Sequence, residues 1–188
     1  MPTFCAPGQR PIRFCSLGCA KGQEAYSIAM LVLEHWPDLK FEVIAIDRVE
    51  MAESFSPIEV ASLSPQCLEK YFVRQSKGWL VCDQVRRRID FRRGEIISCL
   101  PNLPEIDVVF LRNVLCYNSP SDQSSILRLI RDRINPCGWL FLFGTESLRH
   151  DSDWVLVRGH NWSDGAWRRR DAMPVQLLKI ANADNRAE

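Results

Sequence analysis

The sequence lacks the features that define several common classes of protein. It has three histidines, and its eight cysteines include no CxxC pair, so the close ligand spacing of a zinc site is missing. No apolar run reaches the roughly 18 residues of a membrane-spanning helix. The formal net charge of +1 offers no excess charge for binding nucleic acid or an acidic membrane surface. We therefore predict no metal site, no nucleic-acid partner and no membrane insertion.

A secretory leader is also missing, because the first residues are polar and rich in proline. The cysteines lie singly, several of them inside apolar runs, which is typical of buried and reduced thiols. Both observations predict a cytoplasmic protein. With 188 residues, 46% of them hydrophobic, the chain is long enough for one domain with a substantial core. We expect an irregular lead-in at residues 1–11 and that domain at residues 12–188.

The two common glycine-rich signatures of nucleotide-binding proteins are absent. Gly18 and Gly22 do not match the GxGxxG spacing of dinucleotide-binding domains, and Gln23 follows Gly22 where a P-loop requires lysine. These glycines nevertheless lie between a short apolar run at 12–17 and an amphipathic stretch that begins near Gln23. This order of strand, glycine turn and helix is typical of the opening unit of a nucleotide-binding α/β fold.

Further apolar runs predict the rest of the sheet. Residues 41–46, 106–111 and 139–143 each predict a short buried strand, and residues 85–91 predict a weaker one. Helical segments separate these runs, including one that begins at the Ser-Pro-Ser-Asp sequence of residues 119–122. Strands that alternate with helices indicate an α/β fold with a doubly wound, mostly parallel sheet.

One region interrupts this alternation. Residues 64–72 predict a capped helix, and residues 71–83 predict a hairpin that turns at Gly78. Together they indicate a small inserted β-subdomain at about residues 64–90. Residues 49–57, just before it, favour a short helix that ends at a proline.

The pattern is weaker toward the end of the chain. The apolar segments 154–157 and 175–180 predict a closing antiparallel pair of strands. The stretch 159–170 between them is polar and is expected to form a loop.

Two acidic residues near the glycine turn narrow the choice of ligand. Asp47 ends the second strand, where a carboxylate can accept hydrogen bonds from both ribose hydroxyls, although an acid at this position also suits a plain strand-end cap. Glu24 lies in the first helical turn, where it would repel a phosphate and attract a cationic group such as an amino-acid ammonium. A nucleoside that carries an amino acid fits S-adenosylmethionine better than NAD or ATP.

Five stretches of the sequence occur in the order and spacing of a known family. They are SLGCAKGQEAYSIAMLVLE, AIDRV, SPQCLEKYF, FLRNVLCYN and LRLIRDRINPCGWLFLFGTESL. Over about residues 13–148 the chain resembles the chemotaxis receptor glutamate methyltransferases, the CheR type. The resemblance implies the Rossmann-like fold of S-adenosylmethionine-dependent methyltransferases. It also implies methyl transfer to glutamate side chains of chemoreceptor-type proteins, with S-adenosylhomocysteine as the product.

The resemblance implies a role for several residues in holding the cofactor. Gly18, Gly22 and Glu24 would line its methionine end. Asp47 would bind the ribose, and Asn113, which follows a predicted strand, would lie at the edge of the cofactor. The cofactor site is thus expected where the first, second and fourth apolar strands end.

Three further residues are expected around the adenine and the transferring methyl. Glu95 stands where the family has an asparagine near the adenine, and it would put a charge there. Tyr117 would face the methyl group, or would only be a half-buried aromatic with its hydroxyl in water. Arg112 is either a clamp for the substrate or a structural residue at the strand end. No general base is needed, because a carboxylate is already ionised at neutral pH.

The sequence also departs from the family. Lys21 and Gln23 stand where threonine and glutamate are usual, Thr145 replaces a histidine, and Asn118 replaces an aromatic residue. The family has a helical N-terminal domain whose arginine reaches the active site, and nothing in MPTFCAPGQRP matches it. Three expectations remain open: the chain is a fragment, a separate helical domain completes it, or it is not an active receptor methyltransferase.

Two other functions compete with the enzyme. The chain would be a catalytically inactive module that binds S-adenosylmethionine or a protein partner, if the altered positions abolish turnover. It would be an unrelated α/β nucleotide-binding domain if the resemblance is misleading, but the missing GxGxxG and P-loop motifs disfavour this. We rank the methyltransferase first.

Overall fold

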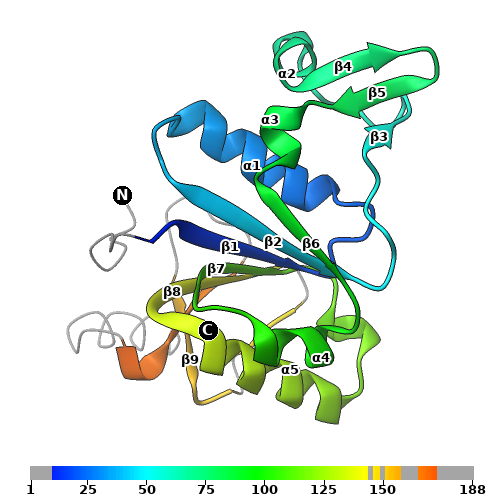
Figure 1. Ribbon diagram of the computed structural model, residues 1–188. Helices are drawn as coiled ribbons and strands as arrows, with labels where there is room; N and C mark the ends of the chain where they lie inside the picture. The colour runs from blue at the N-terminus through cyan, green and yellow to red at the C-terminus, as the bar shows by residue number, and fades with distance from the viewer. Residues whose placement is uncertain (1–9, 144–145, 149–150, 158–164, 173–188) are drawn as a thin grey trace, which may run out of the picture.

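The computed structural model of the chain describes residues 10–143, 146–148, 151–157 and 165–172. Its centre is a seven-stranded sheet in the order β6-β2-β1-β7-β8-β10-β9 (Figure 1). The strands are β1 (Ile12–Leu17), β2 (Phe41–Asp47), β6 (Ile89–Arg93), β7 (Ile106–Leu111), β8 (Ile134–Leu142), β9 (Trp154–Val157) and β10 (Ala166–Arg169). All pairings from β6 to β8 are parallel, and β10 pairs antiparallel with β8 and β9. The predicted α/β fold with a mostly parallel sheet is confirmed.

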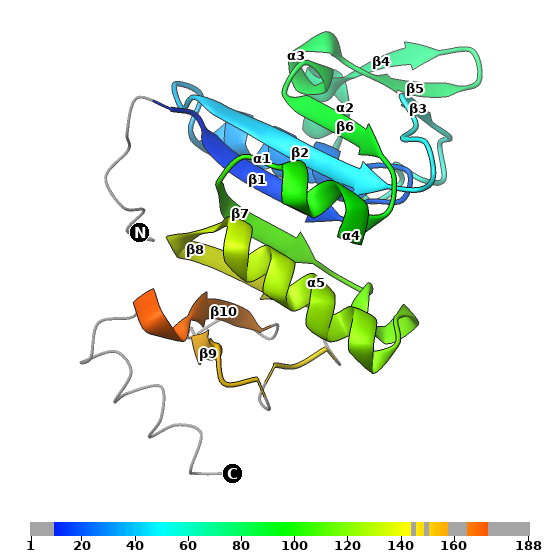
Figure 2. The same cartoon turned by 60° about the horizontal axis from the view of Figure 1, so that its bottom comes forward.

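Helices lie on both faces of this sheet. Helix α1 (Gln23–His35) covers one face, and α4 (Ile96–Cys99) and α5 (Pro120–Arg133) cover the other (Figure 2). The short elements are α3 (Asp83–Arg86), η1 (Leu100–Asn102), η2 (Leu115–Tyr117) and η3 (Arg170–Ala172). Each face has its own buried core, one around α1 and one around α5, as a doubly wound sheet requires. In the described part of the chain, no helix is both long and apolar enough to cross a membrane.

The predicted starts of the two long helices are confirmed. Helix α5 begins at Pro120, and the Ser119 side-chain oxygen accepts a hydrogen bond from the Asp122 backbone N–H at 3.2 Å. Helix α1 begins at Gln23, directly after Gly22 in the left-handed conformation. In both cases a residue suited to the cap position determines where the chain turns into the helix.

A second, three-stranded sheet has the order β3-β5-β4. The expected helix is α2 (Pro65–Tyr71), and the expected hairpin is β4 (Phe72–Gln75) with β5 (Gly78–Val81). The short helix expected at 49–57 is wrong, because this segment contains strand β3 (Ser54–Phe55), which pairs with β5. The Phe55 ring is buried and meets the Tyr26 ring edge-on at 5.8 Å. This contact with α1 outweighs the local preference for a helix.

The closing strands differ from the prediction. Strand β9 at 154–157 is confirmed, but strand β10 lies inside the stretch expected to be a polar loop, and segment 175–180 lies outside the described residues. In β10, Trp167 is buried opposite Leu140 of β8. The neighbouring arginines made this strand look polar, although Arg168 lies over the Trp139 ring at 5.1 Å. Arginine can cover an apolar surface with its stem and its planar guanidinium.

Two smaller expectations also need correction. The strand expected at 85–91 is β6, but it begins only at Ile89 because α3 occupies the preceding residues. The cysteines are not uniformly buried and reduced: Cys15 and Cys19 are buried, Cys116 is exposed, and Cys137 is disulfide-bonded. Burial raises the pKa of the Cys19 thiol to about 12, so this thiol is protonated at neutral pH.

Candidate functional site

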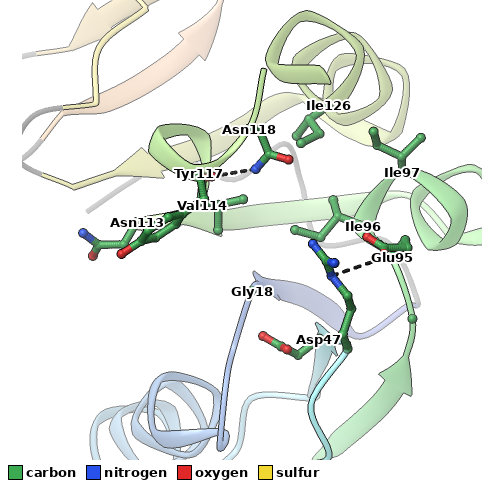
Figure 3. A pocket seen from close by; sticks show the side chains of 12 residues that line it. Gly18, Asp47, Glu95, Ile96, Ile97, Asn113, Val114, Tyr117, Asn118 and Ile126 are labelled. Carbon is green, nitrogen blue, oxygen red and sulfur yellow. Dashed lines mark hydrogen bonds and ion pairs between the residues drawn. The ribbon is translucent and has the colours of Figure 1, made fainter. Parts of the chain in front are cut away.

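A cavity of about 310 Å³ lies at the carboxyl ends of the central strands (Figure 3). Its lining includes the residues Gly18, Asp47, Arg48, Gly94, Glu95, Ile96, Ile97, Asn113, Val114, Tyr117, Asn118 and Ile126. The cavity opens where the chain order of the sheet reverses, since β1 lies between β2 and β7. Ligands of open α/β sheets bind at this switch point, because the loops that follow the two neighbouring strands diverge there.

The loops after β1 and β7 meet closely at this point. Gly18 has φ +74°, and a Cβ placed on it would lie 2.6 Å from Cγ2 of Val114. Asn113, directly after β7, is also left-handed with φ 56°. Glycine and asparagine are the residues that adopt this conformation most readily. Gly18 and Asn113 both line the cavity at the strand ends, and their roles toward a ligand stay predictions.

Asp47 lines the cavity and also caps the end of β2. Its Oδ2 accepts a hydrogen bond from the Ala20 backbone N–H and its Oδ1 from that of Val49, both at 2.8 Å. Each carboxylate oxygen has two lone pairs. The strand-end cap therefore leaves one acceptor site on each oxygen, and the two roles considered for Asp47 are compatible.

Of the three residues expected at the methionine end, Gly18 lines this cavity, whereas Gly22 and Glu24 are not among the described residues that line it. Arg112, expected as a substrate clamp or a structural residue, is not among them either. The Glu24 carboxylate accepts a hydrogen bond from the buried Ser16 hydroxyl at 2.7 Å, and its other oxygen lies 3.4 Å from Nη1 of Arg112. Arg112 also lies over the Phe143 ring at 4.7 Å. Their roles toward a ligand stay predictions.

The left-handed Gly22 serves the structure directly. Its φ is +92°, and an added Cβ would lie 2.2 Å from Cγ of Met51. The Lys21 carbonyl, next to it, accepts a hydrogen bond from the Ala52 backbone N–H at 3.0 Å. The glycine turn is thus held by the segment that leads into the second sheet.

Glu95 lines the cavity as expected, but it is not an isolated charge. Its Oε1 lies 3.1 Å from Nε of Arg48, and both side chains are more than half exposed. Figure 3 shows Glu95 at one side of the cavity, opposite Tyr117. Arg48 was not predicted as a site residue. Its position directly after Asp47, at the end of a strand, was the signal available in the sequence.

Tyr117 lies at the mouth of the cavity on helix η2. The residue is 84% exposed and not half-buried, so its hydroxyl is accessible to a second molecule. The Asn118 side-chain amide donates a hydrogen bond to the Val114 carbonyl at 2.7 Å, and that of Gln123 donates to the Leu115 carbonyl at 2.9 Å. The asparagine that replaces an aromatic residue of the family thus holds the loop that carries Tyr117.

A further acid shapes the same loop and was not predicted. The Glu146 carboxylate accepts hydrogen bonds from the backbone N–H groups of Asn113, Val114 and Leu115 at 2.8 to 2.9 Å. In the sequence it belongs to GTESL, the end of the last stretch that resembles the family. An acid shortly after a parallel strand, at the same edge as Asp47, was the available signal.

The lining residues fit a nucleoside better than a polyphosphate. Two acids, Asp47 and Glu95, face the cavity, and the Arg48 guanidinium is paired with Glu95. Ile96, Ile97 and other apolar side chains offer a surface for a planar base. The volume is at the lower end of the range of small-molecule sites. Within the described residues, no group of histidine, cysteine and acidic side chains could hold a metal ion.

The fold is an α/β domain, and the cavity at the switch point of its sheet suits a ligand that contains a nucleoside. Residues 3–163 match the family described as CheR methyltransferase, SAM binding domain. The chain belongs to this family, and the cofactor of the family is S-adenosylmethionine, as predicted.

Known proteins of similar sequence carry related names. The chain is 34% identical over 156 residues to chemotaxis protein methyltransferase Cher2 of Pseudomonas putida, a match that covers 76% of this chain and 56% of that protein. It is 30% identical over 174 residues to chemotaxis protein methyltransferase 2 of Vibrio cholerae, covering 86% and 60%. The chain thus spans under two thirds of the length of both relatives. The glycopeptide N-methyltransferase MtfA, solved with S-adenosyl-L-homocysteine, is a distant structural likeness, with TM-score 0.44, 11% identity, and coverage of 86% and 55%.

Proposed function

We propose that the domain binds S-adenosylmethionine in the cavity and transfers its methyl group to glutamate side chains of chemoreceptor-type proteins. The family match and the names of the relatives support the reaction and the class of acceptor. The observation that carries the assignment of the site is the cavity between Gly18, Asp47 and Asn113, at the ends of three neighbouring strands. The cytoplasmic location expected from the sequence stays a prediction.

Asp47 is the proposed ribose ligand. The backbone N–H groups of Ala20 and Val49 fix its carboxylate, so it does not have to be ordered when the cofactor binds. A preorganised acceptor loses less conformational entropy on binding than a mobile side chain. Asn113 and Gly18 allow the two loops to approach the same ligand. Glu95 with Arg48 borders the proposed adenine side.

Glu24 is the proposed partner of the ammonium at the methionine end. Its carboxylate is held by Ser16 and lies near Arg112. A carboxylate beside a guanidinium provides one group for the ammonium and one for the carboxylate of an amino acid. In this proposal Arg112, whose side chain is 42% exposed, serves the cofactor or the acceptor from beside Glu24.

The acceptor side requires positioning rather than acid–base chemistry. When bound, S-adenosylmethionine supplies a methyl group on a positively charged sulfur, which an ionised carboxylate can accept without a general base. Tyr117 is proposed to donate a hydrogen bond that orients the incoming glutamate, and the side chains around the cavity limit access of water. A separate helical domain is the proposed source of further contacts to the acceptor.

Calorimetry on the purified chain tests the cofactor half of the proposal. We expect S-adenosylhomocysteine and S-adenosylmethionine to bind with one site per chain, and ATP and NAD not to bind. The matched control is Glu69→Ala, which removes an exposed acid of α2 outside the cavity lining and should leave affinity unchanged. Absence of binding to either sulfur compound would reject the proposal.

Methyl transfer to a chemoreceptor fragment tests the catalytic half. We expect the isolated chain to bind the product more readily than it turns over, because in this proposal only the exposed Tyr117 orients the acceptor glutamate. A displacement of about 1 Å can cost around 10²-fold in rate. Adding a helical domain from a relative should raise the rate. Binding without any transfer, with or without that domain, would favour the inactive binding module.

A further inference from the structure

The carboxylate of Glu146 fills a concave site made by three consecutive backbone N–H groups. Its Oε2 accepts from Asn113 at 2.9 Å, and its Oε1 accepts from Val114 at 2.9 Å and from Leu115 at 2.8 Å. Asn113 is left-handed with φ 56°, and Val114 is right-handed with φ −112° and ψ −49°. Such an alternation turns successive N–H groups toward one point and creates a binding site for an anion.

This site lies in the loop that forms one wall of the cavity. Val114 and Asn113 line the cavity, and Val114 is the residue that closely approaches Gly18. Glu146 itself is not among the described residues that line it. It contacts the backbone of the loop without lining the cavity, so its influence on a ligand passes through residues 113–115.

The same loop is held from its other side by α5 and its lead-in. The Val114 carbonyl accepts from Asn118, and the Leu115 carbonyl accepts from Gln123. These bonds hold carbonyl groups, whereas Glu146 holds N–H groups. Without the carboxylate, the loop would keep its carbonyl partners but would lose the single acceptor that binds three donors together.

We propose that Glu146 is a positioning residue for the cofactor: it acts as an internal anion that holds loop 113–115 in the conformation that forms the cavity wall. The inference rests on the proposed function, since the cavity must be the cofactor site. It predicts that the essential property of Glu146 is a carboxylate in this site, whether or not it is covalently attached to the chain.

The test is binding of S-adenosylhomocysteine to Glu146→Ala, with and without added formate. We expect the variant to bind at least tenfold more weakly than the parent. Formate at high concentration should restore much of the loss, because it can occupy the vacated site and accept the same N–H groups. Formamide and sodium chloride at equal concentration should not restore it.

Two controls make the result specific. Asp151→Ala removes another acid of the same region, which accepts the Asp153 backbone N–H at 2.9 Å; it should bind like the parent and show no effect of formate. Glu146→Gln keeps the shape but not the charge, and it should bind less tightly than the parent and more tightly than Glu146→Ala. Circular dichroism and thermal unfolding report whether each variant is folded.

The outcomes separate the two proposals. If the parent does not bind S-adenosylhomocysteine, the proposed function fails and this inference fails with it. If the parent binds and folded Glu146→Ala binds equally well, only the positioning role is overturned. Weak binding that formate does not restore, with Glu146→Gln as weak as Glu146→Ala, would show a general loss of structure and also overturn it. If Glu146→Ala does not fold, the test is Glu146→Gln. An affinity of Glu146→Gln equal to that of the parent would then overturn the positioning role.

Discussion

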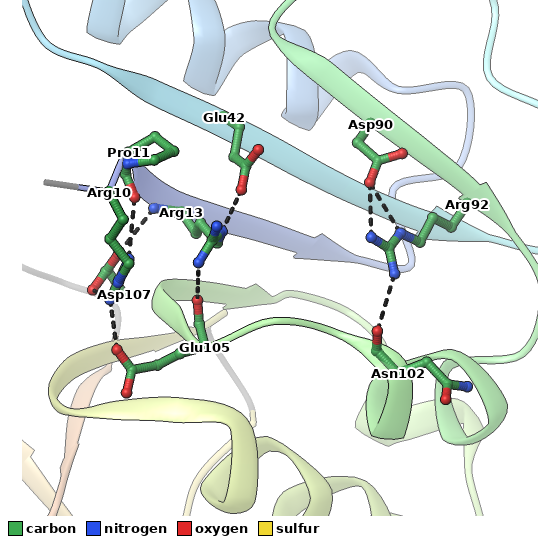
Figure 4. A network of polar contacts seen from close by, with 9 residues as sticks. All are labelled: Arg10, Pro11, Arg13, Glu42, Asp90, Arg92, Asn102, Glu105 and Asp107. Carbon is green, nitrogen blue, oxygen red and sulfur yellow. Dashed lines mark hydrogen bonds and ion pairs between the residues drawn. The ribbon is translucent and has the colours of Figure 1, made fainter.

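Acidic residues make different contacts at the two ends of the parallel strands of the main sheet. We call the side where these strands begin the amino edge and the side where they end the carboxyl edge. At the amino edge, the buried Asp107 receives two hydrogen bonds from the Arg10 guanidinium, at 2.7 and 2.8 Å, and one from the Arg13 backbone N–H at 2.9 Å (Figure 4). Arg10 also pairs with Glu105, and Arg13 with Glu42. At the carboxyl edge, Asp47 and Glu146 are held chiefly by backbone N–H groups.

The difference separates stability from binding. A carboxylate paired with arginine has its charge neutralised and most of its lone pairs used, so it joins strands and offers little to a ligand. A carboxylate held by N–H groups keeps its charge and shapes a loop around a cavity. The hydrogen bond from Arg10 to Asp107 raises the pKa of that guanidinium, so Arg10 keeps its positive charge at alkaline pH. We expect changes at the two edges to affect different measurements.

The largest expected effect on stability is at the amino edge. Asp107→Ala leaves Arg10 and the Arg13 N–H without their shared acceptor. Because the Arg10 side chain is 33% exposed, we expect a loss of about 2 kcal/mol, between the values for exposed and for buried pairs. Urea unfolding measures this loss, and the affinity for S-adenosylhomocysteine should stay within twofold of the parent. Glu69→Ala, outside the network, is the control. A large loss of affinity with unchanged stability would contradict the division between the edges.

The largest expected effect on binding is at the carboxyl edge. Asp47→Ala removes the proposed acceptor of two ribose hydroxyls, each bond being worth roughly 1.5–3 kcal/mol. Calorimetry should show at least a tenfold loss of affinity. Because the variant also leaves the Ala20 and Val49 N–H groups unpaired, stability should fall by about 1 kcal/mol. Parent-like affinity would show that Asp47 is only a strand-end cap.

A smaller effect on binding is expected for the Glu95–Arg48 ion pair at the carboxyl edge. Glu95→Asn restores the residue usual in the family and separates Glu95 from Arg48. Exposed ion pairs contribute about 0–1 kcal/mol, so stability should hardly change. Affinity for S-adenosylhomocysteine should rise by less than tenfold, as a charge near the base is removed. Arg48→Ala is the matched control, and a clear loss of affinity in Glu95→Asn would assign Glu95 a favourable contact.

The sequence predicted the elements better than the contacts between them. Apolar runs and capping residues such as Ser119 act locally, so strand and helix positions followed from them. The role of Glu146 depends on residues more than thirty positions earlier, and no local pattern shows that its carboxylate meets three N–H groups. Strand β10 was missed because the pairing of Trp167 with Leu140 decides it, while the adjacent arginines favour a loop.

The site was predicted in part for the same reason. Gly18, Asp47 and Asn113 end or follow strands, so the topology alone brings them together. Gly22 and Glu24 lie further along the chain, where the turn after β1 leads into α1. The path of that turn decides what they contact. Met51 and Ser16 are their observed neighbours, and neither follows from the spacing of the motif.

The smallest expected effect concerns Glu59, an exposed acid that is bound both by a backbone N–H group and by a cationic side chain. Its carboxylate accepts hydrogen bonds from the Ser56 N–H and hydroxyl and pairs with Lys21 at 3.1 Å. These contacts, the Ser56 N–H first, lower the pKa of Glu59 to about 2. In the unfolded state the pKa of a glutamate is about 4.3. Because the folded-state pKa is lower, the ionised carboxylate stabilises the folded protein above about pH 4.3. This contribution is lost as the pH falls from about 4.3 toward 2.

Comparing the parent with Glu59→Gln tests this pH dependence. The parent should have the higher melting temperature at pH 6, and the difference should shrink at pH 3, because the unfolded parent then binds a proton that the folded parent does not. Glu69→Gln, which has the same change of charge on α2, should show no such trend. A difference that stays constant from pH 6 to pH 3 would mean that Glu59 contributes through its shape and packing rather than its charge. The rule that backbone-held carboxylates keep their charge would then not extend beyond the cavity.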